Sequence, residues 1–272
     1  MEPVEGTFTT DDGVVLRTVT ITGPAFRYEL LHVHGLGEHA GRWTERHIEL
    51  ARRGARVTAF DLRGHGKSGG RPLHADSFER FARDVSEVAS ATVAVSGRPW
   101  VLYGHSMGGL IATSYLIRNC VPRPNVAVLS APALGDSTPA FKRGAAKVLG
   151  RFAPTLGTAT PVKGEHLSRD PRVGEDYAAD PLVQQRGTLG LGRAVFTEQE
   201  SLAPHLGEIT VPTLVIHGGD DILVPTAASE PLTESVSVER RVYPGLRHEV
   251  HFEPEGEQVV ADVGDWIESK LF

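Results

Sequence analysis

Short apolar runs alternate with amphipathic stretches along most of the 272-residue chain. Runs such as "ELLHVHG", "RVTAF", "WVLYG" and "TLVIHGG" are bounded by turn-forming or polar residues, which is typical of buried strands. The stretches between them have helical spacing, most clearly from Ser77 to Val95, where apolar residues face one way and charged residues the other. Strands separated by helices need crossover connections, so the pattern predicts an α/β fold with a mostly parallel central sheet.

Two regions depart from this alternation. At the start, "GTFTT" and "VVLRTVTI" flank a "DDG" turn and alternate with a period of two, which predicts a hairpin. Between about Leu134 and Leu202 the pattern breaks into a proline-rich stretch with only fragments of helix, too long for a bare loop. We therefore expect a core built from residues 1–133 and 203–272. Residues 134–202 would be inserted as a cap or lid over one end of the sheet.

Composition narrows the classes of function. The net charge is −6 and no basic block is present, which argues against a nucleic-acid partner. The single cysteine, Cys120, excludes an internal disulfide and a cysteine-rich metal site. The amino terminus lacks the apolar core of a secretory signal, and no window is long and apolar enough to span a membrane. We therefore expect a soluble, cytoplasmic protein.

The stretch "GHSMG" carries the first candidate chemistry. It matches G-x-S-x-G, in which Gly104 and Gly108 flank Ser106 between a predicted strand and a predicted helix. In such a turn the serine hydroxyl stands above the sheet edge, and the flanking positions must be small because a side chain there would collide with the chain. The alternative is an ordinary glycine-rich turn. The catalytic interpretation therefore requires a base and an acid elsewhere in the sequence.

Candidates for both partners follow Ser106 in the order that this type of site uses, which is serine, acid, histidine. Asp220 and Asp221 lie in the loop after the strand "TLVIHGG", and His248 and His251 lie after the strand "VERRVYPG". A serine hydroxyl is a poor nucleophile until a histidine accepts its proton, and the acid orients that histidine. The spacing alone leaves both pairs open.

Five motifs taken together resemble one family. "HGLGEHAGRW", "DLRGHGKSGG", "GHSMGG", "HGGDDILVP" and "YPGLRHEVHFEPE" are similar to the monoacylglycerol lipase and lysophospholipase-like branch of the α/β-hydrolase family, and "LSRDPRVGEDYAADPLV" resembles the cap of bacterial monoacylglycerol lipases. The resemblance implies an α/β-hydrolase fold, with helices on both faces of the sheet and an inserted cap. It also implies a serine hydrolase that cleaves monoacylglycerols or similar single-chain acyl esters through an acyl-enzyme, without a cofactor or a metal.

Two alternatives stay open beside this activity. A lysophospholipase, or a general carboxylesterase for short and medium chains, would use the same triad on a different ester. A binding protein on the same scaffold without catalytic activity is the second alternative, since a fold does not imply a function. Dehalogenases and epoxide hydrolases of this fold need a carboxylate at the nucleophile position, so Ser106 argues against them.

The resemblance also implies a role for each candidate residue. Ser106 would be the nucleophile and His248 the general base, because the family's histidine directly follows "PGLx". Asp221 would orient that histidine, because the family pattern is H-G-x-x-D. Asp220 would then be a solvated loop acid. His251 would border the pocket or pack at the start of the last helix.

The tetrahedral intermediate of ester hydrolysis needs two backbone donors. The amide of Met107 follows the nucleophile directly, and the resemblance implies that the amide of Leu36 in "HGLG" is the other. His32 and His34 share one strand face, which raises a metal site as an alternative, but no partner cluster completes a coordination set. The glycines of "DLRGHGKSGG" lack the spacing of a phosphate loop, so we expect a structural loop there.

One candidate helix of the insertion has an apolar face with Phe141 and Phe152 and a basic face with Lys142, Arg143 and Lys147. By default such a helix packs its apolar face on the core and leaves its basic face in solvent. Alternatively it is a lid whose phenylalanines contact the lipid ester substrate while the basic face attracts anionic head groups. The second interpretation predicts a transient, peripheral contact with a membrane or lipid aggregate.

Overall fold

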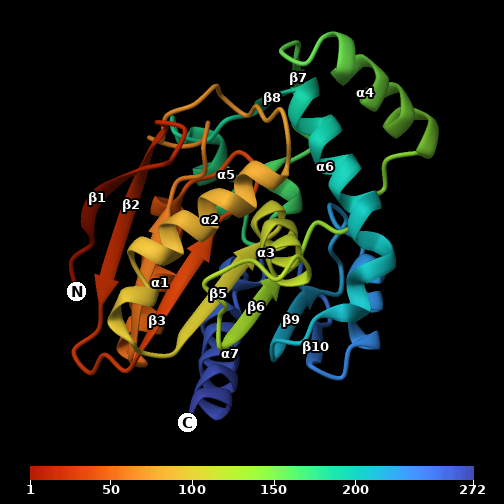
Figure 1. Ribbon diagram of the computed structural model, residues 1–272. Helices are drawn as coiled ribbons and strands as arrows, with labels where there is room; N and C mark the ends of the chain where they lie inside the picture. Colours follow the sequence, from red (N-terminus) through yellow and green to blue (C-terminus); the bar gives the residue numbers. More distant parts are fainter.

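A large twisted sheet forms the centre of the molecule. The computed structural model describes residues 1–272, and its main sheet has eight strands in the order β1-β2-β4-β3-β5-β6-β9-β10 (Figure 1). β2 pairs antiparallel with both β1 and β4, and all other neighbouring strands are parallel. The strands are β1 (Val4–Thr9), β2 (Val15–Thr22), β3 (Tyr28–Val33), β4 (Ala55–Phe60), β5 (Trp100–His105), β6 (Val126–Ser130), β9 (Thr213–Gly218) and β10 (Val238–Tyr243).

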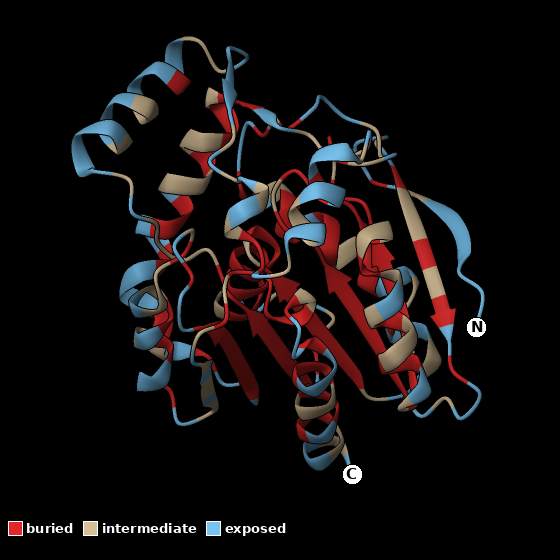
Figure 2. Ribbon diagram, turned by 180° about the vertical axis from the view of Figure 1, so that it is seen from behind, coloured by how far each residue is buried: buried red, intermediate tan, exposed pale blue.

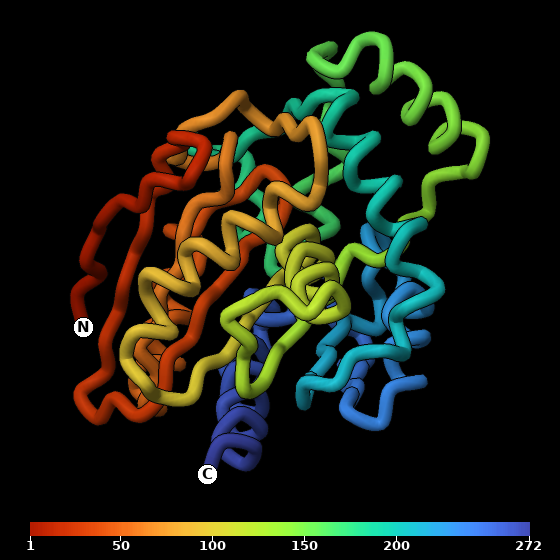
Figure 3. Tube along the Cα trace, in the orientation of Figure 1, coloured from red at the N-terminus to blue at the C-terminus, as the bar shows by residue number.

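Helices cover both faces of this sheet, as the trace in Figure 3 also shows. On one face lie α1 (Thr44–Arg52) and α7 (Gly256–Leu271), and on the other lie α2 (Glu79–Ala91) and α3 (Met107–Ile117). The connections contain short 3-10 helices: η1 (Ala40–Trp43), η2 (Ala94–Ser96), η3 (Gly164–His166), η4 (Ala203–Glu208), η5 (Thr226–Glu234) and η6 (Val250–Phe252). None of the helices is both long and apolar enough to cross a lipid bilayer.

The central strands are buried on both sides, which explains their continuous apolar sequences. Successive residues of β3 show this, because Leu30 packs into the core under α1 and α7 while Leu31 packs into the core under α2 and α3. The same strands are coloured as buried along their length in Figure 2. A parallel strand between two helical layers has no solvent face, so it does not need polar residues at alternate positions.

The predicted mostly parallel sheet, the helices on both of its faces and the opening hairpin are confirmed. The expectation that residues 134–202 contain only fragments of helix is wrong. This stretch forms α4 (Ala140–Phe152), β7 (Gly157–Ala159), α5 (Pro171–Ala179), β8 (Arg186–Thr188) and α6 (Leu189–Leu202). The prolines lie outside these helices or in a first turn, as Pro171 does in α5, where the missing amide costs nothing.

The insertion is attached firmly through the segment before α5. The amide of Glu249 donates to the carbonyl of Leu167 at 2.8 Å. The buried carboxylate of Glu253 accepts the amide of Arg247 at 2.6 Å and the amide of Arg169 at 2.9 Å. These bonds join the insertion to the chain on both sides of His248, so this part of the insertion and the loop that carries His248 form one unit.

α4 is attached in a different way, because its apolar face points away from the protein. Phe141 and Phe152 are 73% and 79% exposed, and in Figure 2 most of the helix is coloured as exposed. On the side that packs on α6, Lys147 pairs with a glutamate of α6, and Arg143 pairs at 2.8 Å with Asp136 in the loop before α4. The basic residues Lys142 and Arg151 stay exposed. The expectation that the apolar face packs on the core is therefore wrong. Arg143 and Lys147 are also not free to attract anionic head groups.

Candidate active site

Ser106 stands at the turn between β5 and α3, at the carboxyl edge of the sheet. Its backbone has φ 52° and ψ −116°, which a residue with a side chain rarely adopts. The amide of Ser106 donates to the carbonyl of Ser130 on β6 at 2.9 Å, and its carbonyl accepts the amide of Leu110 at 3.0 Å. The neighbouring strand and helix therefore hold this strained turn in place.

The glycines on either side of Ser106 allow the turn to fit. A Cβ on Gly108 would overlap the carbonyl oxygens of Val33 and His34 at the end of β3. A Cβ on Gly104 would overlap the backbone of Gly108 in the same way. The first turn of α3 lies directly against the end of β3, and glycine permits this approach because it has no side chain.

Three side chains from three separate loops form one hydrogen-bonded chain. Ser106 Oγ lies 2.9 Å from His248 Nε2, and His248 Nδ1 lies 2.7 Å from Asp221 Oδ2. Because a carboxylate only accepts, Nδ1 carries the proton and donates it to Asp221. Nε2 is then the acceptor for the serine hydroxyl, which is the arrangement that makes a serine nucleophilic.

Asp221 is buried, and its carboxylate has several partners. Oδ1 accepts the amides of Leu223 and Val224, each at 2.9 Å, and Oδ2 lies 3.2 Å from Nε2 of His217. Burial acts to raise the pKa of Asp221, but the charge interaction with His248 and these hydrogen bonds outweigh it and hold the pKa well below its usual value. The carboxylate is therefore ionised throughout the neutral range.

The pKa of His248 is shifted in the opposite direction. Burial acts to lower the pKa of His248, but the charge of Asp221 and its hydrogen bond raise it above the ordinary value of 6.5. Glu249 and Glu38 contribute in the same direction. A raised pKa makes the neutral imidazole a stronger base, which favours transfer of the serine proton to it.

The two rival residues lie in different surroundings. The side chain of Asp220 is exposed, and only its backbone amide is engaged, donating to the carbonyl of Leu246 at 2.8 Å. His251 is buried in η6, where its Nε2 pairs with the hydroxyl of Tyr103 and its ring centroid lies 5.0 Å from that of Trp43. Burial holds the pKa of His251 well below its ordinary value. Neither residue contacts the serine or the histidine of the hydrogen-bonded chain.

The "HGLG" loop after β3 is fixed by its own side chains. His34 donates from Nδ1 to the carbonyl of Gly35 at 2.8 Å and accepts the amide of Leu62 on Nε2 at 2.9 Å. Oε1 of Glu38 accepts the amide of Gly35 at 2.6 Å. Leu36, the next residue, thereby keeps one position beside Ser106. The buried imidazole of His34 is explained by these two bonds and not by a metal.

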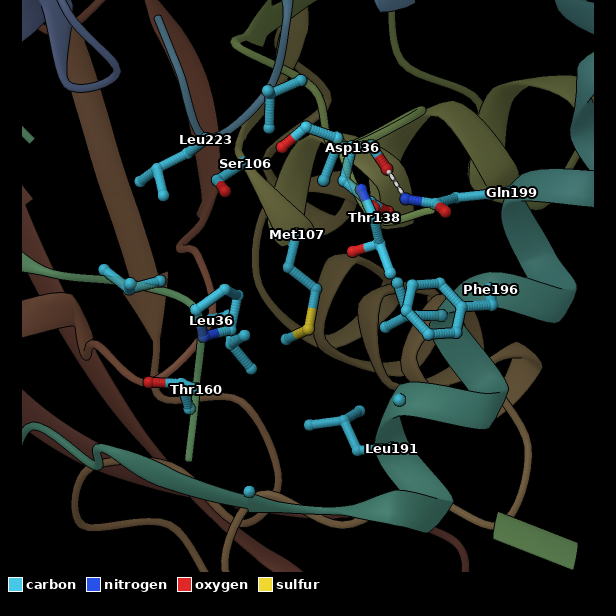
Figure 4. Close-up of a pocket in the computed structure, with 18 of the residues that line it drawn as sticks. Leu36, Ser106, Met107, Asp136, Thr138, Thr160, Leu191, Phe196, Gln199 and Leu223 are labelled. Carbon is cyan, nitrogen blue, oxygen red and sulfur yellow. Dashed lines mark hydrogen bonds between the residues drawn. The ribbon is translucent and has the colours of Figure 1, made fainter. Parts of the chain in front are cut away.

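Leu36 and Met107 both line the cavity onto which Ser106 opens (Figure 4). Met107 is the first residue of α3, so its amide has no acceptor within the helix. The positive end of the helix dipole lies at the same place. An oxygen that gains negative charge beside Ser106 would meet this end of the helix.

A buried group of charges joins the "HGLG" loop to the loop that carries His248. Nη1 of Arg42 donates to Glu38 at 2.7 Å and to Glu249 at 2.8 Å, and Nη2 donates to Glu249 at 3.0 Å. The ring of Tyr177 from α5 stacks on the guanidinium at 4.9 Å. Sequence reasoning missed Glu249 because its partner Arg42 is distant in the sequence. It also missed Arg42 and His217, although their spacing of four from Glu38 and Asp221 was a usable signal.

Two cavities are lined in part by Ser106. The larger has a volume of about 340 Å³ and a largely apolar surface, to which the "HGLG" loop, the turn at Ser106, α6 and the Asp221 loop contribute. Its apolar lining residues labelled in Figure 4 include Leu36, Met107, Leu191, Phe196 and Leu223. The smaller cavity lies next to Glu38, Tyr177 and Glu249 and is more polar. Phe141 and Phe152 line neither cavity.

The "DLRGHGKSGG" loop is structural, as expected. Asp61 is buried, and its carboxylate accepts the amides of Ala40 at 2.8 Å and Lys67 at 2.9 Å. The hydroxyl of Ser68 donates to the carbonyl of Asp61 and accepts the amide of Arg17 at 2.9 Å. These bonds connect the loop to η1 and β2.

Comparison with known proteins gives consistent matches over most of the chain. The family model described as Hydrolase_4, serine aminopeptidase, S33, matches residues 25–255. Monoacylglycerol lipase of Mycolicibacterium smegmatis is 38% identical over 248 residues, which is 88% of this chain and 87% of the relative. Human monoglyceride lipase is 33% identical over 250 residues, covering 87% of this chain and 81% of the relative. The crystal structure of Paleococcus ferrophilus monoacylglycerol lipase has a TM-score of 0.83 and 32% identity, covering 99% of this chain and all of that one.

The fold and the site define a serine hydrolase of the α/β-hydrolase class. The chain belongs to the family described as serine aminopeptidase, S33, within the branch that contains the lipases above. The family name refers to peptidases, whereas these relatives are lipases. The class of bond that this protein cleaves therefore has to be argued from the site.

The approach of α3 to β3 makes a specific prediction about Gly108. Gly108→Ala should reduce stability by about 2 kcal/mol and reduce activity, because the new methyl group meets backbone atoms that cannot move aside. Urea unfolding and hydrolysis of a soluble ester measure the two effects. Gly144→Ala is the control, because a Cβ there meets nothing within 4 Å, and it should leave activity unchanged. A Gly108→Ala variant with wild-type stability would contradict the described geometry.

Proposed function

We propose that this protein hydrolyses monoacylglycerols, or similar esters of a single acyl chain, through an acyl-enzyme intermediate. The observation that carries the proposal is the hydrogen-bonded chain from Ser106 through His248 to Asp221, which opens onto a largely apolar cavity. The curated relatives named monoacylglycerol lipase and monoglyceride lipase support this substrate class. Residues 134–202 would act as the cap over the site, and the two flanking segments as the catalytic core.

In the first half of the reaction, Ser106 Oγ attacks the ester carbonyl carbon while Nε2 of His248 accepts the hydroxyl proton. Asp221 stabilises the imidazolium ion that forms. The carbonyl oxygen becomes an oxyanion and accepts hydrogen bonds from the amides of Leu36 and Met107. The carbon–oxygen bond to glycerol then breaks, and His248 returns the proton to the leaving oxygen.

In the second half, water releases the fatty acid. Nε2 of His248 accepts a proton from a water molecule, whose oxygen attacks the acyl carbon of the ester on Ser106. The second oxyanion is held by the same two amides. The bond between the acyl carbon and the serine oxygen breaks, and His248 protonates Ser106. The serine, the neutral imidazole and the charged Asp221 are then restored.

The two cavities suggest where each half of the substrate binds. The acyl chain would occupy the larger cavity, whose surface is largely apolar. The smaller cavity, about 10 Å³ in volume, has room for a single water molecule, so the glycerol would have to widen it. The buried hydroxyl of Tyr177, which has no hydrogen-bond partner in the protein, would then be available to the glycerol. The charges of Glu38 and Glu249 are already paired with Arg42. A neutral alcohol suits this pocket better than the charged head group of a lysophospholipid.

The same argument weighs against an aminopeptidase. Such an enzyme must bind the free ammonium group of its substrate near the nucleophile, and this calls for an unpaired carboxylate. Asp136 in the larger cavity pairs with Arg143, and both glutamates of the smaller cavity pair with Arg42. Each of these carboxylates thus already has an arginine partner, with Glu38 and Glu249 sharing Arg42.

Ser106→Ala is the direct test of the proposal. The variant should lose monoacylglycerol hydrolysis by about a millionfold and lose labelling by a fluorophosphonate probe, with its melting temperature nearly unchanged. Release of fatty acid is measured on a monoacylglycerol, a diacylglycerol, a lysophospholipid and a short-chain ester. The monoacylglycerol should be the best substrate of the wild-type protein. Substantial turnover by Ser106→Ala would rule out the mechanism, and a preference for lysophospholipid would change the substrate class.

The two neighbouring aspartates offer a matched pair. Asp221→Asn should lower kcat by about ten-thousandfold, whereas Asp220→Asn should stay within a few-fold of wild type. Because the pKa of His248 is raised, the acidic limb of the wild-type kcat/KM profile should lie above pH 6.5. In Asp221→Asn the charge is lost and burial dominates, so the limb of the residual activity should move to lower pH. The reverse ranking of the two variants would assign the role to Asp220.

We also propose that α4 contacts a lipid surface. Its outward face carries Phe141 and Phe152 together with Val148 and Leu149, which are 58% and 53% exposed. The rim of the larger cavity adds Ile222, which is 60% exposed. Apolar side chains in this number favour insertion at the boundary between head groups and acyl chains. The contact would be apolar, because two of the basic residues of α4 pair within the protein.

Replacing both Phe141 and Phe152 by serine tests this contact. Binding to phospholipid vesicles and hydrolysis of aggregated long-chain monoacylglycerol should fall by about tenfold. Hydrolysis of a soluble short-chain ester should not change, since the triad is untouched. Val95→Ser is the control, because Val95 is 69% exposed on η2, away from α4. An equal loss on both substrates, with a lower melting temperature, would show instead that α4 supports the fold.

A further inference from the structure

One arginine outside the larger cavity contacts three residues that line it. Arg143 of α4 donates to Oδ2 of Asp136 at 2.8 Å and to Oε1 of Gln199 at 2.7 Å. Its guanidinium also stacks on the ring of Phe196 at 4.6 Å. Asp136, Phe196 and Gln199 all line the cavity, whereas Arg143 does not (Figure 4).

The carboxylate of Asp136 is the reason that this contact matters. Asp136 is a charged group in a wall that also offers Leu191, Val195 and Phe196 to the substrate, and its side chain is only 21% exposed. A carboxylate partly removed from water is costly unless it is paired. Arg143 does not line the cavity, but it supplies the opposite charge. Asp136 is therefore not an unpaired anion in the cavity wall.

Gln199 extends the contact towards the reacting serine. Its Oε1 accepts from Arg143, and its Nε2 donates to the carbonyl of Ala133 at 2.8 Å. The amide of Ala133 in turn donates to the carbonyl of Ser106 at 3.0 Å. Arg143 thereby fixes the orientation of the side-chain amide of Gln199. Through this amide it also holds the part of the cavity wall that lies next to Ser106.

From these contacts we propose that Arg143 is a specificity-determining positioning residue. It neutralises Asp136 and holds Gln199 and Phe196 so that the cavity accepts a long acyl chain. This inference rests on the proposed function, because it takes the acyl chain to lie in this cavity. A short acyl chain would contact less of this wall than a long chain does. The effect of replacing Arg143 should therefore grow with the length of the acyl chain.

The same helix offers a matched control. Lys147 lies one turn after Arg143 and pairs with Glu200 of α6, so it also joins α4 to α6 through a charge. Glu200 does not line the cavity, and its side chain is 52% exposed. Lys147→Met and Arg143→Met each remove one ion pair between α4 and its neighbours. They differ in whether the partner residue faces the cavity.

The experiment compares kcat/KM for p-nitrophenyl butyrate and p-nitrophenyl laurate, both below their aggregation concentrations. Arg143→Met should lower the value for laurate by about tenfold and leave the value for butyrate within about twofold. Lys147→Met should leave the ratio of the two values unchanged. The double variant Asp136→Asn, Arg143→Met should recover most of the laurate activity, because no unpaired charge is left in the wall. Arg143→Lys, which keeps the charge, should fall between wild type and Arg143→Met.

Three results would overturn the inference. They are an equal loss on both esters in Arg143→Met, the same change of ratio in Lys147→Met, and no recovery in the double variant. Melting temperatures identify a variant that has lost its fold, and Arg143→Lys then supplies the comparison. Failure of the proposed function has a separate signature, because wild-type protein would then hydrolyse neither ester and Ser106 would not react with a fluorophosphonate.

Discussion

The arrangement of the site depends on one close approach between backbones, that of the first turn of α3 to the end of β3. At Gly108 this approach leaves no room for a side chain. It brings the amide of Met107 and the loop that carries Leu36 to the same point beside Ser106. If the helix began a little farther from the strand, the two amides that we propose as donors to the oxyanion would be farther apart. The strained backbone of Ser106 is the local cost of this arrangement, offset by bonds to β6 and α3.

Charge compensation has the second largest influence on the site. Each buried carboxylate near Ser106 has a cationic or hydrogen-bonding partner from another part of the chain, as Asp221 has in His217 and His248, and as Glu38 and Glu249 have in Arg42. The net effect is a negative potential at His248, which raises its pKa while every carboxylate stays satisfied. The same contacts connect the loops, so electrostatics and geometry are set together.

Sequence patterns predicted the elements whose burial is decided locally. The parallel strands are recognisable because both of their faces are buried, and the serine turn because its glycines are required by sterics. The order of serine, acid and histidine also followed from the chain. The orientation of α4 could not be predicted, because an amphipathic pattern does not show which face of the helix contacts the protein. The orientation is fixed by Arg143, whose partners include Gln199, a residue distant in the sequence. Glu249 was missed for the same reason, because its partner Arg42 is distant in the sequence.

The insertion has two attachments of unequal kind, and this has a consequence for how such proteins can diverge. The segment around Leu167 and Arg169 shares its hydrogen bonds with Glu249 and Glu253, so a change in its length would be transmitted to His248. α4 makes no backbone hydrogen bond to that segment or to the histidine loop, and much of its surface is exposed to solvent. Recombination between relatives should therefore exchange residues 140–153 freely, while residues 164–180 should be inherited together with the histidine loop. Changes in residues 140–153 would then alter the range of substrates. Residues 164–180 would keep the position of the catalytic histidine constant.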